Sequence, residues 1–206
     1  MNATTLPRLR IVILAAGFSS RLGLPKALAR VHGKSLLRRT LQSVAGLTPG
    51  KVFVVLPRNC ARYRIEARGL DVTFIPNARR AAGLSSSVRL GIERARYSSA
   101  LLLLPVDLVN LQRRDVAKLV SCWRADPRRV TARRIGRYGG TPLILPRWLY
   151  PRALEVAGDI GLRELVSALP SRQRVLLDLP SAASDVDTPQ DLRTARRRLR
   201  STSFSL

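Results

Sequence analysis

Residues 11–28 read IVILAAGFSSRLGLPKAL, and this stretch decides the expected fold. The four leading residues, 11–14, are apolar and predict a buried strand. Three small residues, 15–17, follow this strand, and side chains this small leave backbone N–H groups free to approach a ligand. The polar loop after them presents two cations, Arg21 and Lys26, which can bind a polyphosphate. The stretch therefore predicts a strand that ends in a nucleotide-binding loop.

Apolar runs alternate with amphipathic helical patterns through the first half of the chain. Further strands are predicted at 51–57, 71–76 and 100–104. Helices are predicted at 35–44 and in the segment after 84, where Ser85 or Ser86 can act as the N-cap. This alternation is typical of a Rossmann-like, three-layer α/β/α sandwich with a mostly parallel central sheet. We expect a ligand at the carboxyl ends of the parallel strands.

The second half of the chain has a less regular pattern. Short strands are predicted at 130–135 and 142–145, on either side of a turn at Gly139 and Gly140. The segments that follow predict helices at 147–156 and 162–168 and a strand at 174–179. The last helix has a clear start, with Thr188 as N-cap, Pro189 at the first helical position and Asp191 completing a cap of the capping-box type.

The composition indicates one globular domain over residues 1–206, with a core from about 9 to 200. The net charge of +24 invites a nucleic-acid interpretation. However, the arginines are spread along the whole chain, and only 5% of the residues are aromatic, which leaves little to stack on bases. The charge therefore favours attraction of anionic substrates over a specific nucleic-acid partner.

The cysteines and the N-terminal residues indicate the cellular compartment in which the protein is expected. Cys60 and Cys122 lie far apart without the spacing of a zinc site, which is typical of a reduced cytoplasm. Arg8, Arg10 and the apolar run after them imitate a signal peptide, but the run is short and forms a good core strand. We therefore expect a cytoplasmic protein without a membrane partner.

Several segments together resemble a known family. LAAGFSSRLGLPKAL, at 14–28, resembles the signature LAAGxSxRxGxPK of the MobA-like nucleotidyltransferases, whose fold is that of the nucleotide-diphospho-sugar transferases. NARRAAGLSSSVRLGI, at 77–92, resembles the family's second nucleotide-contacting segment. GGTPLILPRWL, GDIGLREL and DVDTPQDL resemble later blocks of the molybdenum cofactor cytidylyltransferase branch. The resemblance spans residues 11–192.

The resemblance implies the site residues. The nucleotide-binding set is Leu14, Ala15, Ala16, Gly17, Arg21, Lys26, Asn77, Gly83, Ser85 and Ser87. Asp107 stands where the family places a metal-binding aspartate, and Asp187 of DVDTP is the second expected ligand, in competition with Asp185. The expected catalytic residues are Arg21, Lys26 and Asp107, and the expected substrate-side residues are Asp159 and Arg163.

Two positions depart from the family pattern. Leu108 and Val109 follow Asp107 where relatives carry a DxP sequence, and Thr141 stands where relatives often carry His or Asn. The first change concerns the loop behind the carboxylate, and the second concerns the acceptor side.

The implied reaction is Mg²⁺-dependent transfer of a nucleotidyl group to a phosphorylated acceptor, with release of pyrophosphate. A phosphate nucleophile is already ionised near neutral pH, so the reaction needs charge neutralisation and in-line positioning rather than a general base. His32, the one histidine, therefore need not be catalytic. The LAAG form, rather than LAGG, resembles members that use CTP, and molybdopterin is the implied acceptor.

Three alternatives stay open at this point. The acceptor can be a sugar or alditol phosphate. The protein can instead be a non-catalytic partner that carries the cofactor to a molybdoenzyme apo-protein. Nucleic-acid binding is the third alternative, and its motive is the net charge.

Overall fold

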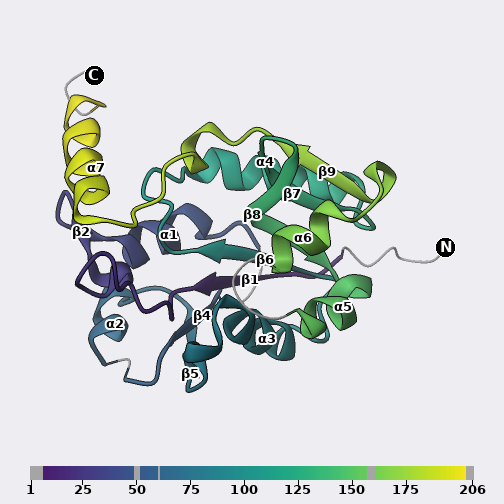
Figure 1. The fold of residues 1–206 in the computed structure, drawn as a ribbon, viewed down its shortest axis with the longest axis horizontal. Helices are drawn as coiled ribbons and strands as arrows, with labels where there is room; N and C mark the ends of the chain where they lie inside the picture. The colour runs from purple at the N-terminus through teal and green to yellow at the C-terminus, as the bar shows by residue number, and fades with distance from the viewer. Residues whose placement is uncertain (1–6, 49–51, 60, 157–160, 203–206) are drawn as a thin grey trace.

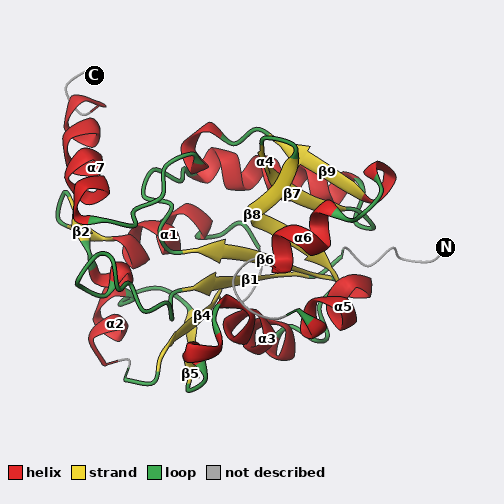
Figure 2. Cartoon of the chain, in the orientation of Figure 1, coloured by secondary structure: helices red, strands yellow, loops and turns green. Residues whose placement is uncertain are grey.

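The computed structural model describes residues 7–48, 52–59, 61–156 and 161–202. A seven-stranded sheet forms its centre, in the order β5-β4-β1-β6-β8-β7-β9 (Figures 1 and 2). Four strands at one side run parallel: β1 (Leu9–Leu14), β4 (Val52–Pro57), β5 (Val72–Asn77) and β6 (Ala100–Pro105). These are the four strands predicted for the first half of the chain, and their positions confirm the prediction.

The other side of the sheet mixes strand directions. β8 (Tyr138–Pro146) runs antiparallel to both β6 and β7 (Val130–Ile135). β9 (Arg174–Leu177) pairs in parallel with β7 at the edge. The sheet is therefore mostly parallel, as predicted, and β8 is its reversed strand. A separate hairpin of β2 (Arg30–Val31) and β3 (Lys34–Ser35) turns at His32 and Gly33, both of which have a positive φ.

Successive residues of β1 enter two different cores, so the sheet is the middle of three layers. Ile11 and Ile13 join the core that contains buried residues of α1 (Leu36–Val44), α2 (Ala61–Glu66), α4 (Arg113–Ala125) and α7 (Pro189–Thr202). Val12 and Leu14 join the core on the opposite face, under α3 (Leu84–Arg94), α5 (Tyr150–Glu155) and α6 (Gly161–Ser167). The structure thus confirms the predicted α/β/α sandwich (Figure 2).

Short 3-10 turns complete the chain: η1 (Lys26–Leu28), η2 (Arg80–Ala82), η3 (Arg147–Leu149), η4 (Ser171–Gln173) and η5 (Pro180–Ala182). Two helices begin with side-chain caps: α1, within one residue of its predicted start, and α7, with the predicted cap. Ser35 caps α1 by accepting a hydrogen bond from the Arg38 N–H. At α7, the Thr188 hydroxyl accepts from the Asp191 N–H while the Asp191 carboxylate accepts from the Thr188 N–H, which is the reciprocal capping box. No helix in the described ranges has the length and apolar character needed to cross a membrane.

The predicted cap of α3 is wrong. The N-cap is Gly83, whose φ of +82° lies in a region that favours glycine. Ser85 and Ser86 lie within the first turn, where their hydroxyls donate to the carbonyls of Ala82 and Gly83. A capping hydroxyl has to accept from a backbone N–H, so neither serine acts as the cap.

The turn predicted at Gly139 and Gly140 is also wrong, because both glycines lie inside β8. The chain reverses at Gly136, which has a φ of +59°. Packing explains the two strand glycines. A Cβ at Gly139 would lie 2.6 Å from Val166 Cγ1, and one at Gly140 would lie 2.4 Å from Ile135 Cδ1.

The substitution Gly139→Ala is expected to destabilise the protein by about 1–3 kcal/mol, the typical cost of overpacking. Val166 is fully buried and β-branched, so it has little freedom to move away from the added methyl group. Urea denaturation measures the effect. Gly17→Ala is the matched control, because a Cβ there meets nothing within 4 Å. Equal stability of the two variants would contradict the packing explanation.

Candidate active site

A cavity of about 430 Å³ lies at the carboxyl ends of β1 and β6. Part of its wall is the end of β1 and the loop after it, Leu14, Ala15, Ala16 and Gly17. The cavity is also lined by Gly83 and Ser87, at the start of α3, and by Asp107, which follows β6. The structure therefore brings together most of the predicted nucleotide-binding residues.

The small residues after β1 only partly fulfil their expected role. The Ala15 N–H donates to the Val55 carbonyl oxygen at 2.9 Å, so it extends the sheet and is not free. Within the described residues, the N–H groups of Ala16 and Gly17 have no such partner. The backbone donors available to a ligand are therefore those of the last two small residues.

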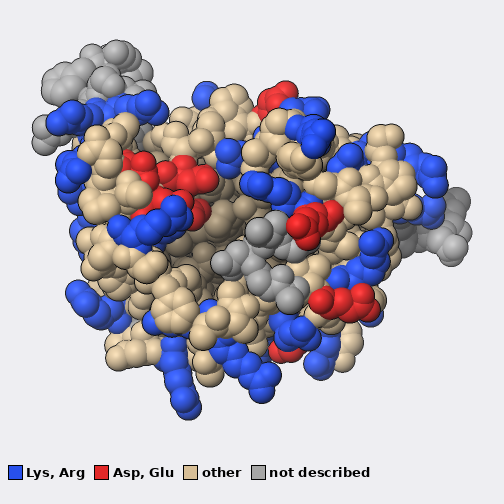
Figure 3. All heavy atoms as spheres, viewed as in Figure 1, with Lys and Arg blue, Asp and Glu red and all other residues tan. Residues whose placement is uncertain are grey.

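Lys26 joins two carboxylates from distant parts of the chain. Its Nζ atom lies 3.1 Å from Asp107 Oδ2 and 2.6 Å from Asp187 Oδ1. Arg21 Nη2 lies 2.9 Å from the other oxygen of Asp187. In Figure 3 a group of acidic side chains (red) lies beside the hollow on this face, next to basic side chains (blue). The two predicted cations and the two predicted metal ligands thus form one cluster.

Local structure holds these groups in place. The Ser19 hydroxyl accepts from the Lys26 N–H at 2.9 Å, which fixes the start of η1. Asp187 lies directly before the capping box of α7, and its N–H donates to Asp191 Oδ2 at 3.1 Å. The Val186 N–H donates to the Asp107 carbonyl oxygen at 3.1 Å, and Leu108 forms a bridge with Asp185. Backbone pairing thus fixes the loop after Asp107, where the DxP sequence is replaced.

The cluster is electrostatically coupled. The hydrogen bond from Lys26 lowers the pKa of Asp187 below its ordinary value. Partial burial lowers the pKa of Lys26, but the charge of Asp107 and the hydrogen bonds to both carboxylates outweigh it, so the net pKa is raised. Burial and the nearby charge of Asp107 raise the pKa of Asp185. At neutral pH the ammonium group of Lys26 therefore stabilises the carboxylates of Asp107 and Asp187.

The same pair fits a divalent cation. Mg²⁺ in nucleotide sites is typically held by one or two carboxylates and by phosphate oxygens of the substrate. Asp107 and Asp187 both reach the single Nζ atom of Lys26, so their oxygens converge on one point that a cation can occupy. The donor set therefore suits a hard metal ion.

Three predicted nucleotide-binding residues, Arg21, Asn77 and Ser85, do not line the cavity. Asn77 is 2% exposed, and its amide nitrogen donates to the hydroxyls of Ser86 and Ser87 at 2.8 and 3.0 Å. Its Oδ1 accepts from the Arg79 N–H at 2.8 Å. Asn77 thus shapes the connection between β5 and α3. The Ser85 hydroxyl is occupied by the carbonyl of Ala82.

A second cavity of about 370 Å³ adjoins the first. The two share Leu84, Pro105 and Asp107 in their walls. Arg163, predicted on the substrate side, lines this second cavity together with Thr141. Asp159, its predicted partner, lies outside the described residues.

Sequence reasoning missed three residues that line these cavities, Phe18, Arg80 and Arg133. Phe18 is exposed in the first cavity, where the guanidinium carbon of Arg80 lies 4.2 Å from the centroid of its ring. Arg133 lines the second cavity, as does Asp185, which the sequence offered only as a competitor of Asp187. Phe18 stands at a variable position of the signature. Arg80 and Arg133 are single members of arginine pairs, so nothing in the local pattern separates them from surface arginines.

Comparison with known proteins identifies a family that agrees with this site. The family described as the MobA-like NTP transferase domain matches residues 11–175. The probable molybdenum cofactor guanylyltransferase of Rhodopirellula baltica is 28% identical over 195 residues, which cover 90% of each chain.

Solved structures share the fold. Rv0371C of Mycobacterium tuberculosis in complex with manganese superposes with a TM-score of 0.71 at 22% identity, over 94% of this chain and 100% of the other. The 2-C-methyl-D-erythritol 4-phosphate cytidylyltransferase of Thermus thermophilus gives a TM-score of 0.69 at 22% identity, over 94% and 99%. The family match covers most of the chain, from the nucleotide signature to the edge strand β9. The chain therefore belongs to the MobA-like NTP transferase family and is a nucleotidyltransferase.

Proposed function

We propose that the protein transfers CMP from CTP to molybdopterin, in a reaction that depends on Mg²⁺ and releases pyrophosphate. The observation that supports this best is the meeting of two cavities at Asp107. One cavity has the nucleotide signature in its wall, and the other leaves room for an acceptor beside the same carboxylate. A transferase needs both substrates at one point.

The residues have separate tasks in this reaction. The backbone around Gly17 and the start of α3 bind the nucleotide, while Arg21 and Lys26 neutralise its phosphates. An oxygen of the acceptor phosphate forms a bond to the α-phosphorus. The bond from that phosphorus to the oxygen bridging the α- and β-phosphates breaks, and pyrophosphate leaves with the electron pair. Because the nucleophile is already ionised, no side chain has to accept a proton.

Asp107 and Asp187 are the residues that would hold the metal. When bound, Mg²⁺ supplies neutralisation of charge on the phosphate oxygens. The manganese complex of Rv0371C supports a divalent cation in this fold. Lys26 contacts both carboxylates, so it is positioned to pass from them to the phosphates when the metal binds.

The choice of base rests on the LAAG sequence at 14–17. Relatives differ on this point, since the curated relative above is a guanylyltransferase and the structure from Thermus thermophilus is a cytidylyltransferase. A thermal-shift comparison of the four nucleoside triphosphates with Mg²⁺ tests it. At a hundredfold excess over Kd, we expect CTP to raise Tm by about 5–10 °C. A larger shift with GTP would contradict transfer of CMP and leave nucleotidyl transfer standing.

Pyrophosphate release identifies the acceptor. We expect turnover with CTP and molybdenum cofactor, and none with a panel of sugar and alditol phosphates. Turnover with a sugar phosphate, and none with molybdenum cofactor, would show that the acceptor is the sugar phosphate and not molybdopterin. Tight binding of the cofactor without turnover of any of the four nucleotides would contradict an enzymatic role and indicate a carrier.

A further inference from the structure

The second cavity contains a cation whose hydrogen-bonding capacity is unused. Arg133 lines this cavity from β7, and its side chain is only 13% exposed. Within the described part of the chain, its guanidinium has one ion-pair contact, Nη1 to Asp185 Oδ1 at 3.8 Å, and no hydrogen bond. Charge-assisted hydrogen bonds from arginine are typically about 2.7–2.9 Å long, so this contact is an ion pair at long range.

A nearly buried guanidinium without hydrogen bonds is costly, because burial removes water from its five N–H donors. Its neighbour on the same strand shows the contrast. Arg134 Nη2 donates to the Leu176 carbonyl oxygen at 3.0 Å, and its Nε lies 3.3 Å from Asp178. Arg134 thus has the partners of a structural arginine, whereas Arg133 has donors that face a cavity.

The strand geometry aims Arg133 at this space. The pairing of β7 with β8 shifts register between Ala132 and Arg133, and such irregularities re-aim the side chains beside them. Across the ladder, Arg133 pairs with Gly140, which also lines the cavity. The cavity continues to Asp107 and so to the first cavity.

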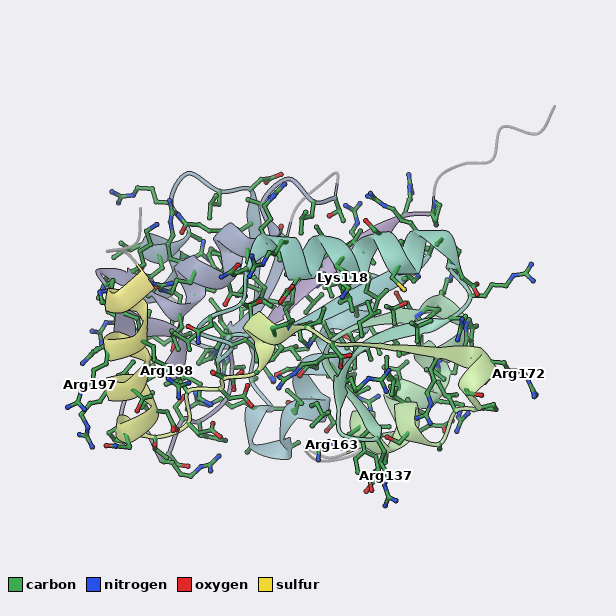
Figure 4. All side chains as sticks on the ribbon, turned by 90° about the horizontal axis from the view of Figure 1, so that it is seen from above. Lys118, Arg137, Arg163, Arg172, Arg197 and Arg198 are labelled. Atoms are coloured by element: carbon green, nitrogen blue, oxygen red, sulfur yellow. The ribbon has the colours of Figure 1, made fainter. Side chains whose placement is uncertain are left out.

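We propose that Arg133 binds the phosphate of the acceptor and so selects a phosphomonoester for this cavity. The planar fork of an arginine matches two phosphate oxygens, and a phosphate held there lies in the cavity that Asp107 shares with the nucleotide. Arg163, an exposed residue of α6 that is labelled in Figure 4, lines the same cavity and adds a second positive charge. This inference rests on the proposed function, because it names the group by which the acceptor is recognised.

Phosphate binding tests the inference without catalysis. The first cavity is filled with Mg²⁺ and the non-hydrolysable α,β-methylene analogue of CTP, and inorganic phosphate is then titrated by calorimetry. We expect Arg133→Gln to weaken phosphate binding by about 10- to 100-fold, the usual effect of losing hydrogen bonds between charged groups. Arg134→Gln is the matched control, with the same change of charge one residue away, and we expect it to bind phosphate like the wild type.

Arg133→Lys keeps the charge and loses the fork of donors, so its loss of affinity should lie between those of the wild type and Arg133→Gln. It also provides the test if Arg133→Gln does not fold. Equal affinity of wild type and Arg133→Gln would overturn the inference. Equal losses in the variants at 133 and 134 would also overturn it, because only net charge would then matter, as would a wild type that binds no phosphate.

Failure of the proposed function has a different signature. If the CTP analogue does not shift Tm, transfer of CMP is wrong, and the same titration is done with the GTP analogue. If Arg133→Gln binds phosphate more weakly than the wild type but molybdenum cofactor gives no turnover, the acceptor is wrong and the role of Arg133 stands. With a productive acceptor, Arg133→Gln should raise KM for the acceptor about tenfold or more and leave KM for the nucleotide unchanged.

Discussion

Replacing Asp107 with Asn is expected to lower the rate of pyrophosphate release by about a thousandfold. Asp107 is the carboxylate at the point where the two cavities meet, and it shares the cation Lys26 with Asp187. Asparagine keeps the size and shape of the side chain but removes the negative charge that would hold a divalent cation. Loss of several kcal/mol of charge stabilisation in the transition state corresponds to a rate loss of this order.

The measurement is kcat for pyrophosphate release at saturating nucleotide, together with the Tm of each protein. Asp178→Asn is the control, because Asp178 is an exposed carboxylate paired with Arg134 on the edge of the sheet. We expect the control to keep full activity and Asp107→Asn to keep the fold. If Asp107→Asn retained a tenth of the wild-type rate or more, Asp107 would not be the metal-binding carboxylate.

The sequence predicts the parallel half of the sheet well, because its strands are buried on both faces. In β6, for example, Leu101–Leu104 are all fully buried, so the strand appears as an unbroken apolar run. The start of α7 is predictable for a local reason, since Thr188 and Asp191 form their cap within one turn. Signals of this kind depend on neighbours in the chain.

The wrong predictions have two different causes. Gly139 and Gly140 read as a turn, but their lack of side chains is required by Val166 and Ile135. Ser85 and Ser86 read as caps, yet Gly83 precedes them with a backbone conformation that itself starts the helix. In both cases the same residue type satisfies two different local rules: tertiary packing decides between them for the glycines, and the backbone of the preceding residue decides for the serines.

The candidate site also contains both residues that the sequence predicts and residues that it does not. The signature predicts the cavity wall from Leu14 to Gly17, and its link to Asp187, 161 residues beyond Lys26, comes only from the family resemblance. Arg133 gives no sequence signal, because the chain is rich in arginine and its role depends on a register shift between two strands. Residues whose position depends on such irregularities have to be located in the structure.

Replacing Lys26 with Met is expected to lower the rate by about a hundredfold or more and to reduce stability within a defined range of pH. The rate falls because a cation that neutralises the transferred phosphates is lost. Stability falls because Asp107 and Asp187 lose their shared partner. Since Asp187 is partly exposed, the expected loss is modest, about 1 kcal/mol.

The range of pH follows from the two pKa shifts. The hydrogen bond from Lys26 lowers the pKa of Asp187 in the folded protein. The contribution of Asp187 to the free energy of unfolding is therefore fully present above the carboxyl pKa of the unfolded chain, about 4, and is lost as pH falls through the folded pKa. The pKa of Lys26 is raised in the folded protein. Its contribution to the free energy of unfolding is therefore fully present below the lysine pKa of the unfolded chain, about 10.4, and is lost as pH rises through the folded pKa. The difference between wild type and variant should therefore be largest between about pH 4 and 10.

Urea denaturation at pH 3 and pH 7 measures this difference, with Lys34→Met as the control. Lys34 is exposed and donates a hydrogen bond to Gln42, so its loss should have the same small effect at both pH values.

Without nucleotide, Mn²⁺ should raise the Tm of Lys26→Met more than that of the wild type, because the metal replaces the missing cation between the carboxylates. A stability loss that is the same at pH 3 and pH 7, together with no added effect of Mn²⁺, would show that Lys26 acts through packing of its aliphatic chain and does not compensate the charge of Asp107 and Asp187.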